Sequence, residues 1–239
     1  MGLVRYLVGL LFIIAVPVAL VTTTVRILAN EPLVYEYAID EYDAMQTTGI
    51  ARDELLRAGS ELRNYFNNDE DEIFVRVERD GSPIRLFNDR ETIHLRDVKN
   101  LMIKNFRVQE ASVIFVLTYV VAVFIWARES SLRILAKQLL LSVLLSLAII
   151  GGVGAFAFTG FHESFDQFHR IVFDNDFWQL DPSRDRLIQM FPEPFWEDAI
   201  LWGGIAVLAQ LGALALLSAT YLGLTRRSAE PHDLTSGQP

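Results

Sequence analysis

The sequence predicts an α-helical membrane protein: four transmembrane helices with a small α+β extracytoplasmic region that contains helices and a β-hairpin. Hydrophobic residues make up 51% of the 239-residue chain, yet the net charge is -9, so apolar and acidic residues must occupy different segments. A helix rising about 1.5 Å per residue crosses the hydrocarbon core with about 17 to 25 residues. Four apolar stretches lie near this length, at residues 6–25, 111–127, 138–158 and 199–224.

Basic residues near these stretches set the expected orientation, because Lys and Arg in short connections stay in the cytoplasm. No small-residue cleavage site follows the first stretch before Arg26, so we expect a retained anchor rather than a signal peptide. The chain is therefore expected to be a multi-pass protein of the plasma membrane with both termini in the cytoplasm. The basic residues that decide this are Arg5, Arg128, Arg133, Lys137, Arg226 and Arg227.

These boundaries divide the chain into eight expected parts. The last part is expected to be disordered because it contains Ser, Gly and Pro and few apolar residues. The parts are transmembrane helix 1 at 1–29, an extracytoplasmic segment at 30–110, transmembrane helix 2 at 111–127, a cytoplasmic loop at 128–137, transmembrane helix 3 at 138–158, a second extracytoplasmic segment at 159–198, transmembrane helix 4 at 199–224 and a cytoplasmic tail at 225–239.

In the first extracytoplasmic segment, the periodic spacing of apolar residues predicts several elements of secondary structure. Helical spacing of apolar residues predicts an amphipathic helix over 51–66, and alternation predicts strands at 73–78 and 83–87 joined by a glycine turn. From Glu91 a helical pattern runs toward the second apolar stretch. His94 and Asp97 are three residues apart on it and would be neighbours, as a general base and its carboxylate are. The alternative is an exposed pair on a charged surface helix.

The second extracytoplasmic segment is short and rich in aromatic residues. Phe161, Phe165, Phe168 and Val172 recur on one helical face, which predicts a helix at the membrane surface or lining a cleft there. Turn-forming residues at 173–182 end this helix. The neighbouring face carries His162, Asp166 and His169.

These histidines allow three interpretations. A metal site would need three or four ligands, for which His94 and the three residues just named are candidates, but no His-Glu-x-x-His motif is present. A proton-handling pair needs no metal, because an imidazole accepts and returns a proton near neutral pH. In the third interpretation the side chains only cap turns and meet lipid headgroups. We predict no metal at this site.

Several classes of chemistry are excluded by composition. The chain has no cysteine, which removes disulfides, thiolate nucleophiles and thiolate metal ligands. It has no Gly-rich nucleotide loop and no basic patch for nucleic acid, so we expect no nucleotide, no nucleic acid and no cofactor.

Two stretches resemble the signatures of one family. The string from His94 to Lys99, His-Leu-Arg-Asp-Val-Lys, precedes an apolar stretch, and residues 168–182 read Phe-His-Arg-Ile-Val-Phe-Asp-Asn-Asp-Phe-Trp-Gln-Leu-Asp-Pro. Both are similar to the lipoprotein intramolecular transacylase family, Lit, as are residues 185–188 and 192–196. The likeness extends over nearly the whole chain in layout, with outer segments after the first and third apolar stretches.

The resemblance implies an acyltransferase acting at the outer face of the membrane. Its partners would be diacylglyceryl-modified lipoproteins and the phospholipid bilayer. The enzyme would move the sn-2 acyl chain of such a lipoprotein onto the amine of its N-terminal cysteine and leave a lyso-form lipoprotein. In family terms His94 and His169 are the expected catalytic pair, and His162 has no role that carries over.

The residues suit this chemistry. An ester and an amine on one substrate need no enzyme nucleophile when they are held together, so proton transfer is the remaining task. We expect His94 as the base and His169 as its partner. The residues expected to support them, by orienting the rings or by meeting phosphate or an oxyanion, are Asp97, Asp166, Asp176, Arg96, Lys99 and Trp178. We also expect Gly151, Gly152 and Gly154 to permit close helix packing.

Two other functions remain open at this level. A non-enzymatic membrane protein would bind a partner through its outer segments. A metal-dependent hydrolase would contain bound zinc.

Overall fold

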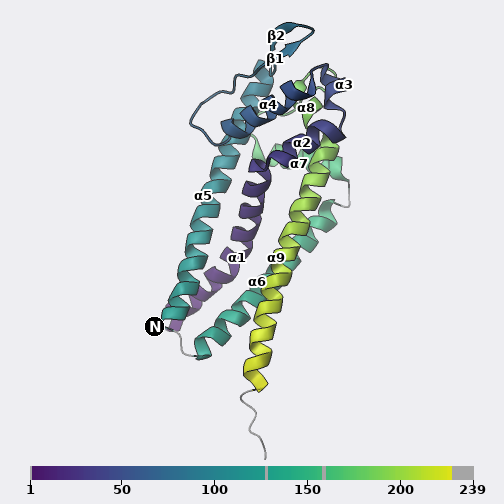
Figure 1. Cartoon of the computed structure of the whole chain (residues 1–239). Coiled ribbons are helices and arrows are strands. Elements are labelled where there is room, and N and C mark those ends of the chain that lie inside the picture. Colours follow the sequence, from purple (N-terminus) through teal and green to yellow (C-terminus); the bar gives the residue numbers. More distant parts are fainter. Residues whose placement is uncertain (1, 127–128, 158–159, 228–239) are drawn as a thin grey trace, which may run out of the picture.

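Four long helices form the body of the molecule. The computed structural model describes residues 2–126, 129–157 and 160–227. The long helices are α1 (Gly2–Asn30), α5 (Asp89–Ile125), α6 (Glu129–Ala157) and α9 (Glu193–Arg227), and they stand as a tilted bundle (Figure 1). Each is long and apolar enough to cross a membrane. The four apolar stretches predicted to span the membrane fall on these four helices, except that residues 127, 128 and 158 lie outside the described ranges, as do residue 159 and the predicted tail from residue 228 onward.

The short elements gather at the end of the bundle opposite the N-terminus (Figure 1). The predicted amphipathic helix, the hairpin and the aromatic helix are all present among them. They are α2 (Pro32–Glu41), α3 (Ala44–Thr48), α4 (Arg52–Tyr65), β1 (Arg76–Arg79), β2 (Ser82–Arg85), α7 (Phe161–Val172) and α8 (Arg186–Met190).

The hairpin is shorter than the sequence predicts. Its two strands pair antiparallel, with Arg76 opposite Arg85 and Arg79 opposite Ser82. Asp80 and Gly81 form the turn with φ values of 52° and 73°, the left-handed conformation that short hairpin turns require. The strand expected from residue 73 begins only at Arg76. Ile73 and Val75 still pack into the core of the cap, and the Val75 carbonyl accepts from the Leu86 N–H at 2.9 Å just beyond the paired strands.

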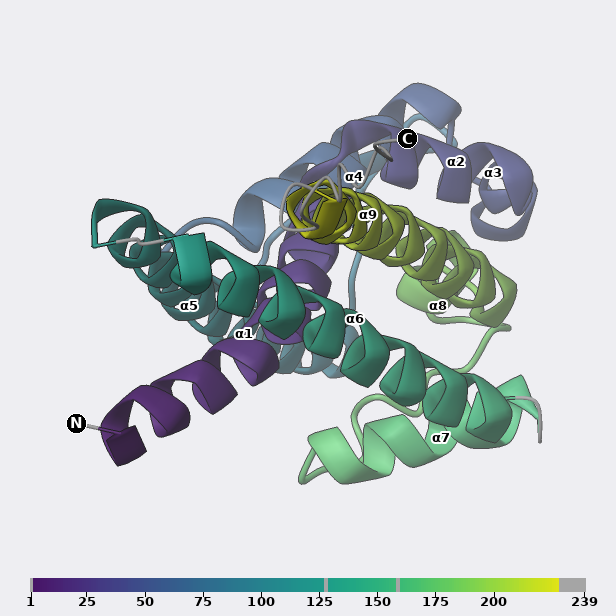
Figure 2. The same ribbon diagram turned by 90° about the horizontal axis from the view of Figure 1, so that it is seen from below.

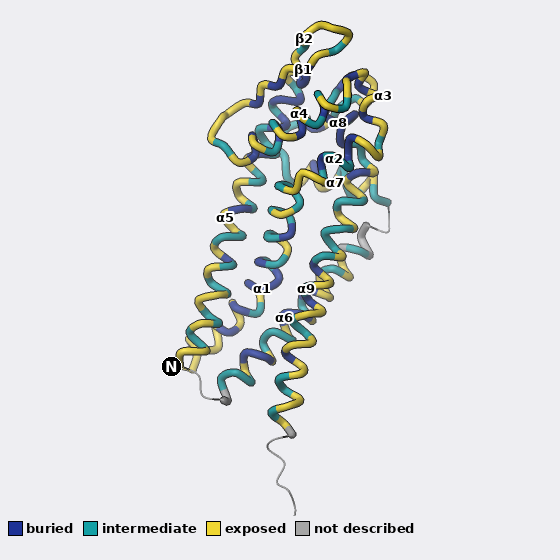
Figure 3. Tube along the Cα trace, in the orientation of Figure 1, coloured by how far each residue is buried: buried dark blue, intermediate teal, exposed yellow. Residues whose placement is uncertain are grey.

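One buried cluster joins the short elements into a cap. It combines residues of α2, α4, the hairpin and the start of α5 with residues of α8 and α9. Figure 3 shows the buried residues concentrated there, whereas the long helices carry many exposed ones. Those exposed positions are largely apolar, and apolar surface of this extent marks contact with a membrane. The cap, by contrast, has the buried core of a water-soluble domain.

α1 is the central helix of the bundle. It packs against each of the other three long helices, and the view from below shows it between α5 and α9 (Figure 2). The prediction of close packing at Gly151, Gly152 and Gly154 does not hold among the described residues, because a Cβ atom at any of the three would meet nothing within 4 Å there. Close approach occurs instead at Gly203, where a Cβ atom would lie 3.4 Å from Leu28 Cδ1.

Candidate active site

α5 carries the first histidine of the candidate site. The helix begins with a capping box: the Asn88 side chain accepts from the Glu91 N–H at 3.0 Å, and Glu91 Oε2 accepts from the Asn88 N–H at 2.7 Å. The 37 residues of α5 extend about 55 Å, well beyond a hydrocarbon core of about 30 Å. Charged residues fill its first part, up to Glu110. His94 therefore lies on the polar part of α5, outside the apolar stretch.

α7 carries the second histidine. His169 sits in its last turn, and its Nδ1 atom lies 2.7 Å from the backbone carbonyl oxygen of Phe165. Because a carbonyl only accepts hydrogen bonds, Nδ1 must carry the hydrogen and donate. The neutral ring then has Nε2 as its acceptor atom.

The two imidazoles meet although 75 residues separate them in the chain. Their ring centroids are 6.0 Å apart at an interplanar angle of 39°. Each side chain is almost fully buried, with relative exposures of 7% for His94 and 8% for His169. The structure therefore brings one residue of each signature stretch to the same place.

Aromatic rings enclose the pair. Phe173 lies 5.2 Å from His94 and 5.6 Å from His169, centroid to centroid. Trp178 stacks on His169 at 4.9 Å with an angle of 29°, and Phe165 lies 4.3 Å away. The histidines therefore have apolar surroundings that favour their neutral forms.

The electrostatics follow from this burial. The pKa of His94 is lowered to about 4, chiefly by burial and then by the neighbouring His169, while Asp97 acts in the opposite direction. Burial also lowers the pKa of His169, against the opposing effects of the Phe165 carbonyl and Asp166. Both rings are consequently neutral near pH 7. His94 Nδ1 is buried and has no hydrogen-bond partner among the described residues.

Asp97 and Asp176 hold the loop after α7 against α5. Asp97 Oδ2 accepts from Asn175 Nδ2 at 2.8 Å, and the backbone carbonyl of Asp176 accepts from Arg90 Nη2. Within the described ranges, neither carboxylate forms a hydrogen bond to a histidine. Asp97 acts on His94 only through its charge, and both residues position the segment that carries Phe173 and Trp178.

The other expected supporting residues point to different partners. Asp166 lies 3.9 Å from Arg170, and Arg96 lies 3.8 Å from Glu72. Lys99 is buried and donates to the Asn68 side chain at 2.8 Å and to the Glu70 carbonyl at 2.6 Å. Arg96 and Lys99 are thus engaged with the acidic loop before β1.

His162 stands apart from the pair. Its side chain is 71% exposed, and its Nδ1 atom lies 2.9 Å from Glu193 Oε2. Hydrogen bonding to Glu193 raises the pKa of His162, which is the opposite of the shift at His169. The two histidines of α7 therefore have different environments.

Sequence reasoning missed Phe173 and Arg90. Phe173 touches both imidazoles and ends α7, whereas the sequence pattern places it only in a turn. Arg90 precedes His94 by one helical turn, donates to Asp176 and has its Nε atom buried without a partner in the described part of the chain. The sequence signal that could have identified Arg90 is its position four residues before His94, on the same face of the helix. The same described residues include no group of three or more His, Cys, Asp or Glu that could hold a metal ion.

Comparison with known proteins identifies one family. The model of that family, described as lipoprotein intramolecular transacylase Lit, matches residues 10–196. An uncharacterised protein of Aquifex aeolicus (strain VF5) is 27% identical over 221 residues, which cover 92% of this chain and 95% of that protein.

Solved structures share the fold. The membrane-integral lipoprotein intramolecular transacylase Lit from Bacillus cereus matches with a TM-score of 0.73 at 20% identity, over 95% of this chain and 100% of that one. A histidine-to-arginine variant of the same protein matches with a TM-score of 0.74 at 21% identity, over 95% and 96% of the two chains.

Proposed function

The chain belongs to the lipoprotein intramolecular transacylase family, a family of integral membrane acyltransferases, and we propose that its substrate is a diacylglyceryl-modified lipoprotein with a free N-terminal cysteine amine. The enzyme moves the sn-2 acyl chain onto that amine. The observation that carries the proposal is the buried pair His94 and His169, 6.0 Å apart between ring centroids.

The reaction needs only proton transfer from the enzyme. The amine nitrogen attacks the sn-2 ester carbonyl, the new N–C bond forms, and the bond from that carbon to the glyceryl oxygen breaks. One proton leaves the nitrogen and one reaches the departing oxygen, so the products are an amide and a free hydroxyl. Because both reacting groups belong to one molecule, holding them together supplies much of the rate acceleration.

The tautomer of His169 favours it as the proton acceptor. Its Nδ1–H is occupied by the Phe165 carbonyl, so Nε2 is free to take the amine proton. The sequence suggested His94 for this step. With a pKa of about 4, the protonated His94 ring is the stronger acid and suits delivery of the proton to the glyceryl oxygen. We propose a relay from His169 through His94.

Surrounding residues keep water out of this relay. Phe165, Phe173 and Trp178 pack on the imidazoles, and a dry site protects the ester from hydrolysis during transfer. α7 also presents Phe168 and Ile171 at 48% and 74% exposure. An amphipathic helix with such a face lies at a membrane surface, where the acyl chains of the substrate would reach the pair.

We place the cap and the pair on the extracytoplasmic side, with segments 30–110 and 159–198 outside. The opposite end of the bundle carries the N-terminus (Figure 1). Most of the expected cytoplasmic loop 128–137, including Arg133, forms the first turns of α6, and basic residues at this end fit the positive-inside rule. Because the chain has no cysteine, single cysteines report the orientation. A membrane-impermeant maleimide should label Ser82→Cys in intact cells, and Gly2→Cys only after permeabilisation. The reverse pattern would contradict the assignment.

The proposed activity is tested by measuring which of the two acyl chains of the substrate, sn-1 or sn-2, is transferred. Purified enzyme should transfer an isotope-labelled sn-2 chain to the cysteine nitrogen of a synthetic diacylglyceryl lipopeptide, as mass spectrometry of the product will show. A label at sn-1 should remain on the glyceryl group. The same lipopeptide with an acetylated amine is the control and should not react. Transfer of the sn-1 label, or no transfer from either position, would refute the proposal.

A further inference from the structure

A cavity of about 880 Å³ opens between α1, α5 and α6, far from the histidine pair. Tyr119, on its α5 wall, follows His94 by 25 residues on the same helix, which corresponds to about 38 Å at a rise of about 1.5 Å per residue. The cavity is therefore at the other end of the bundle. Its volume falls within the range of about 300–1,000 Å³ that is typical of small-molecule sites.

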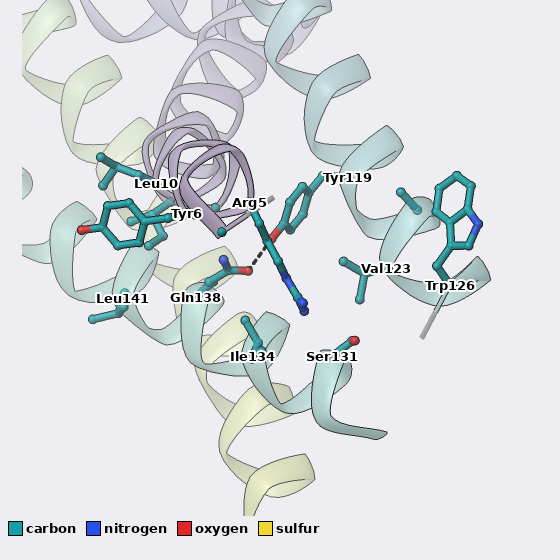
Figure 4. A pocket seen from close by; sticks show the side chains of 14 residues that line it. Arg5, Tyr6, Leu10, Tyr119, Val123, Trp126, Ser131, Ile134, Gln138 and Leu141 are labelled. Carbon is teal, nitrogen blue, oxygen red and sulfur yellow. Dashed lines mark hydrogen bonds between the residues drawn. The ribbon is translucent and has the colours of Figure 1, made fainter. Parts of the chain in front are cut away.

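One charged side chain enters a space whose other described lining residues are uncharged. The walls include Leu10, Ile134 and Leu141, and Arg5 extends from α1 into the gap between α5 and α6 (Figure 4). Arg5 is the one charged residue among the described residues that line the cavity. No hydrogen bond or ion pair holds its guanidinium within that part of the chain. An apolar space with an unpaired cation at one end is complementary to an amphiphile with an anionic head.

Two uncharged polar side chains of the lining are paired with each other. Tyr119 donates its hydroxyl hydrogen to Gln138 Oε1 at 2.9 Å (Figure 4). Gly9 permits this arrangement, because a Cβ atom there would clash with Gln138 Nε2. The pair joins α5 to α6 beside α1 and leaves Arg5 as the charge available to a ligand.

We propose that the cavity binds one anionic phospholipid of the adjacent leaflet, with its phosphate on Arg5 and an acyl chain along the apolar walls. With the cap outside, this leaflet is the cytoplasmic one. Basic pockets between transmembrane helices on that side bind anionic headgroups, and an Arg near an anionic membrane surface adds to that attraction. The lipid would fill the space between α1, α5 and α6.

The test compares two lipids that differ only in headgroup. Binding of the first lipid to the purified full chain is titrated by native mass spectrometry with phosphatidylglycerol and with phosphatidylcholine of the same chains. The wild type should bind phosphatidylglycerol about fivefold more tightly, the ratio that corresponds to about 1 kcal/mol. Arg5→Gln should remove this preference. The matched control Arg107→Gln, at an exposed arginine on the polar part of α5, should retain it.

Two further arms distinguish a lipid bound in the cavity from a free phosphate ester bound to Arg5 alone. Ala122→Phe, which fills the cavity from α5, should weaken binding of both lipids at least fivefold. Soluble glycerol 3-phosphate should not displace the lipid, because it lacks the acyl chain. Unchanged phosphatidylglycerol binding in Arg5→Gln, unchanged lipid binding in Ala122→Phe, or displacement by glycerol 3-phosphate would each overturn the proposal.

Discussion

Replacing His94 or His169 with alanine is expected to lower the rate of acyl transfer about 10²- to 10⁴-fold, the usual contribution of a general acid or base. Each variant removes one ring from the buried pair and leaves the other without a proton partner. The measurement is the initial rate of lyso-form product formation by purified enzyme at saturating lipopeptide.

Control variants distinguish a loss of catalysis from a loss of folding. His162→Ala removes an exposed histidine of the same helix α7 that pairs with Glu193, and its rate should stay within about twofold of wild type, as surface changes rarely perturb a protein. His94→Gln and His169→Gln nearly preserve side-chain volume but cannot relay a proton, so each should be as inactive as the alanine variant. Full activity in either alanine variant would remove that histidine from the mechanism.

Replacing Glu91 with alanine should strongly destabilise the junction between α5 and α8. The Glu91 carboxyl group is 1% exposed and accepts from two backbone N–H groups, those of Asn88 at 2.7 Å and Leu187 at 2.6 Å. Burial raises the pKa of Glu91, and these two donors oppose the shift. Alanine leaves both donors unpaired, at a cost of about 1–3 kcal/mol each.

We therefore expect Glu91→Ala to lower the free energy of unfolding by about 2–5 kcal/mol, measured by thermal unfolding in detergent. Activity should fall as well, because the same capping box sets the start of α5 shortly before His94. Glu61→Ala is the matched control, since Glu61 pairs with Arg57 on the exposed surface and such pairs contribute less than about 1 kcal/mol. Equal stability of the two variants would show that Glu91 does not join α5 to α8.

The long helices could be predicted because hydropathy and length are properties of a continuous segment. The structure extends them beyond the predicted apolar stretches: α5 starts at Asp89, where its capping box lies, and joins the helical pattern expected from Glu91 to the apolar stretch from residue 111 in one helix. α2 was missed although Glu31 caps its first turn and Pro32 occupies its first position. α3 has only five residues between left-handed Asp43 and Gly49, too few for any helical period to show.

The candidate site was predictable only in part. Family signatures singled out His94 and His169, and the spacing of apolar residues predicted the helix that carries each, α5 and α7. The same spacing placed His162 beside His169, yet only the last turn of α7 is covered by Phe173 and Trp178. Asp97 is close to His94 in sequence, but it accepts its hydrogen bond from Asn175, 78 residues away. Such partners depend on how the loop after α7 folds back, which no local pattern encodes.

The most direct test of the paired mechanism is the transfer rate of the double variant His94→Ala/His169→Ala. Two residues that act as one proton relay lose their function together, so the second substitution should cost little after the first. We predict a double-variant rate within about threefold of the slower single variant. A loss equal to the product of the two single losses would show that the histidines act independently and would contradict the relay.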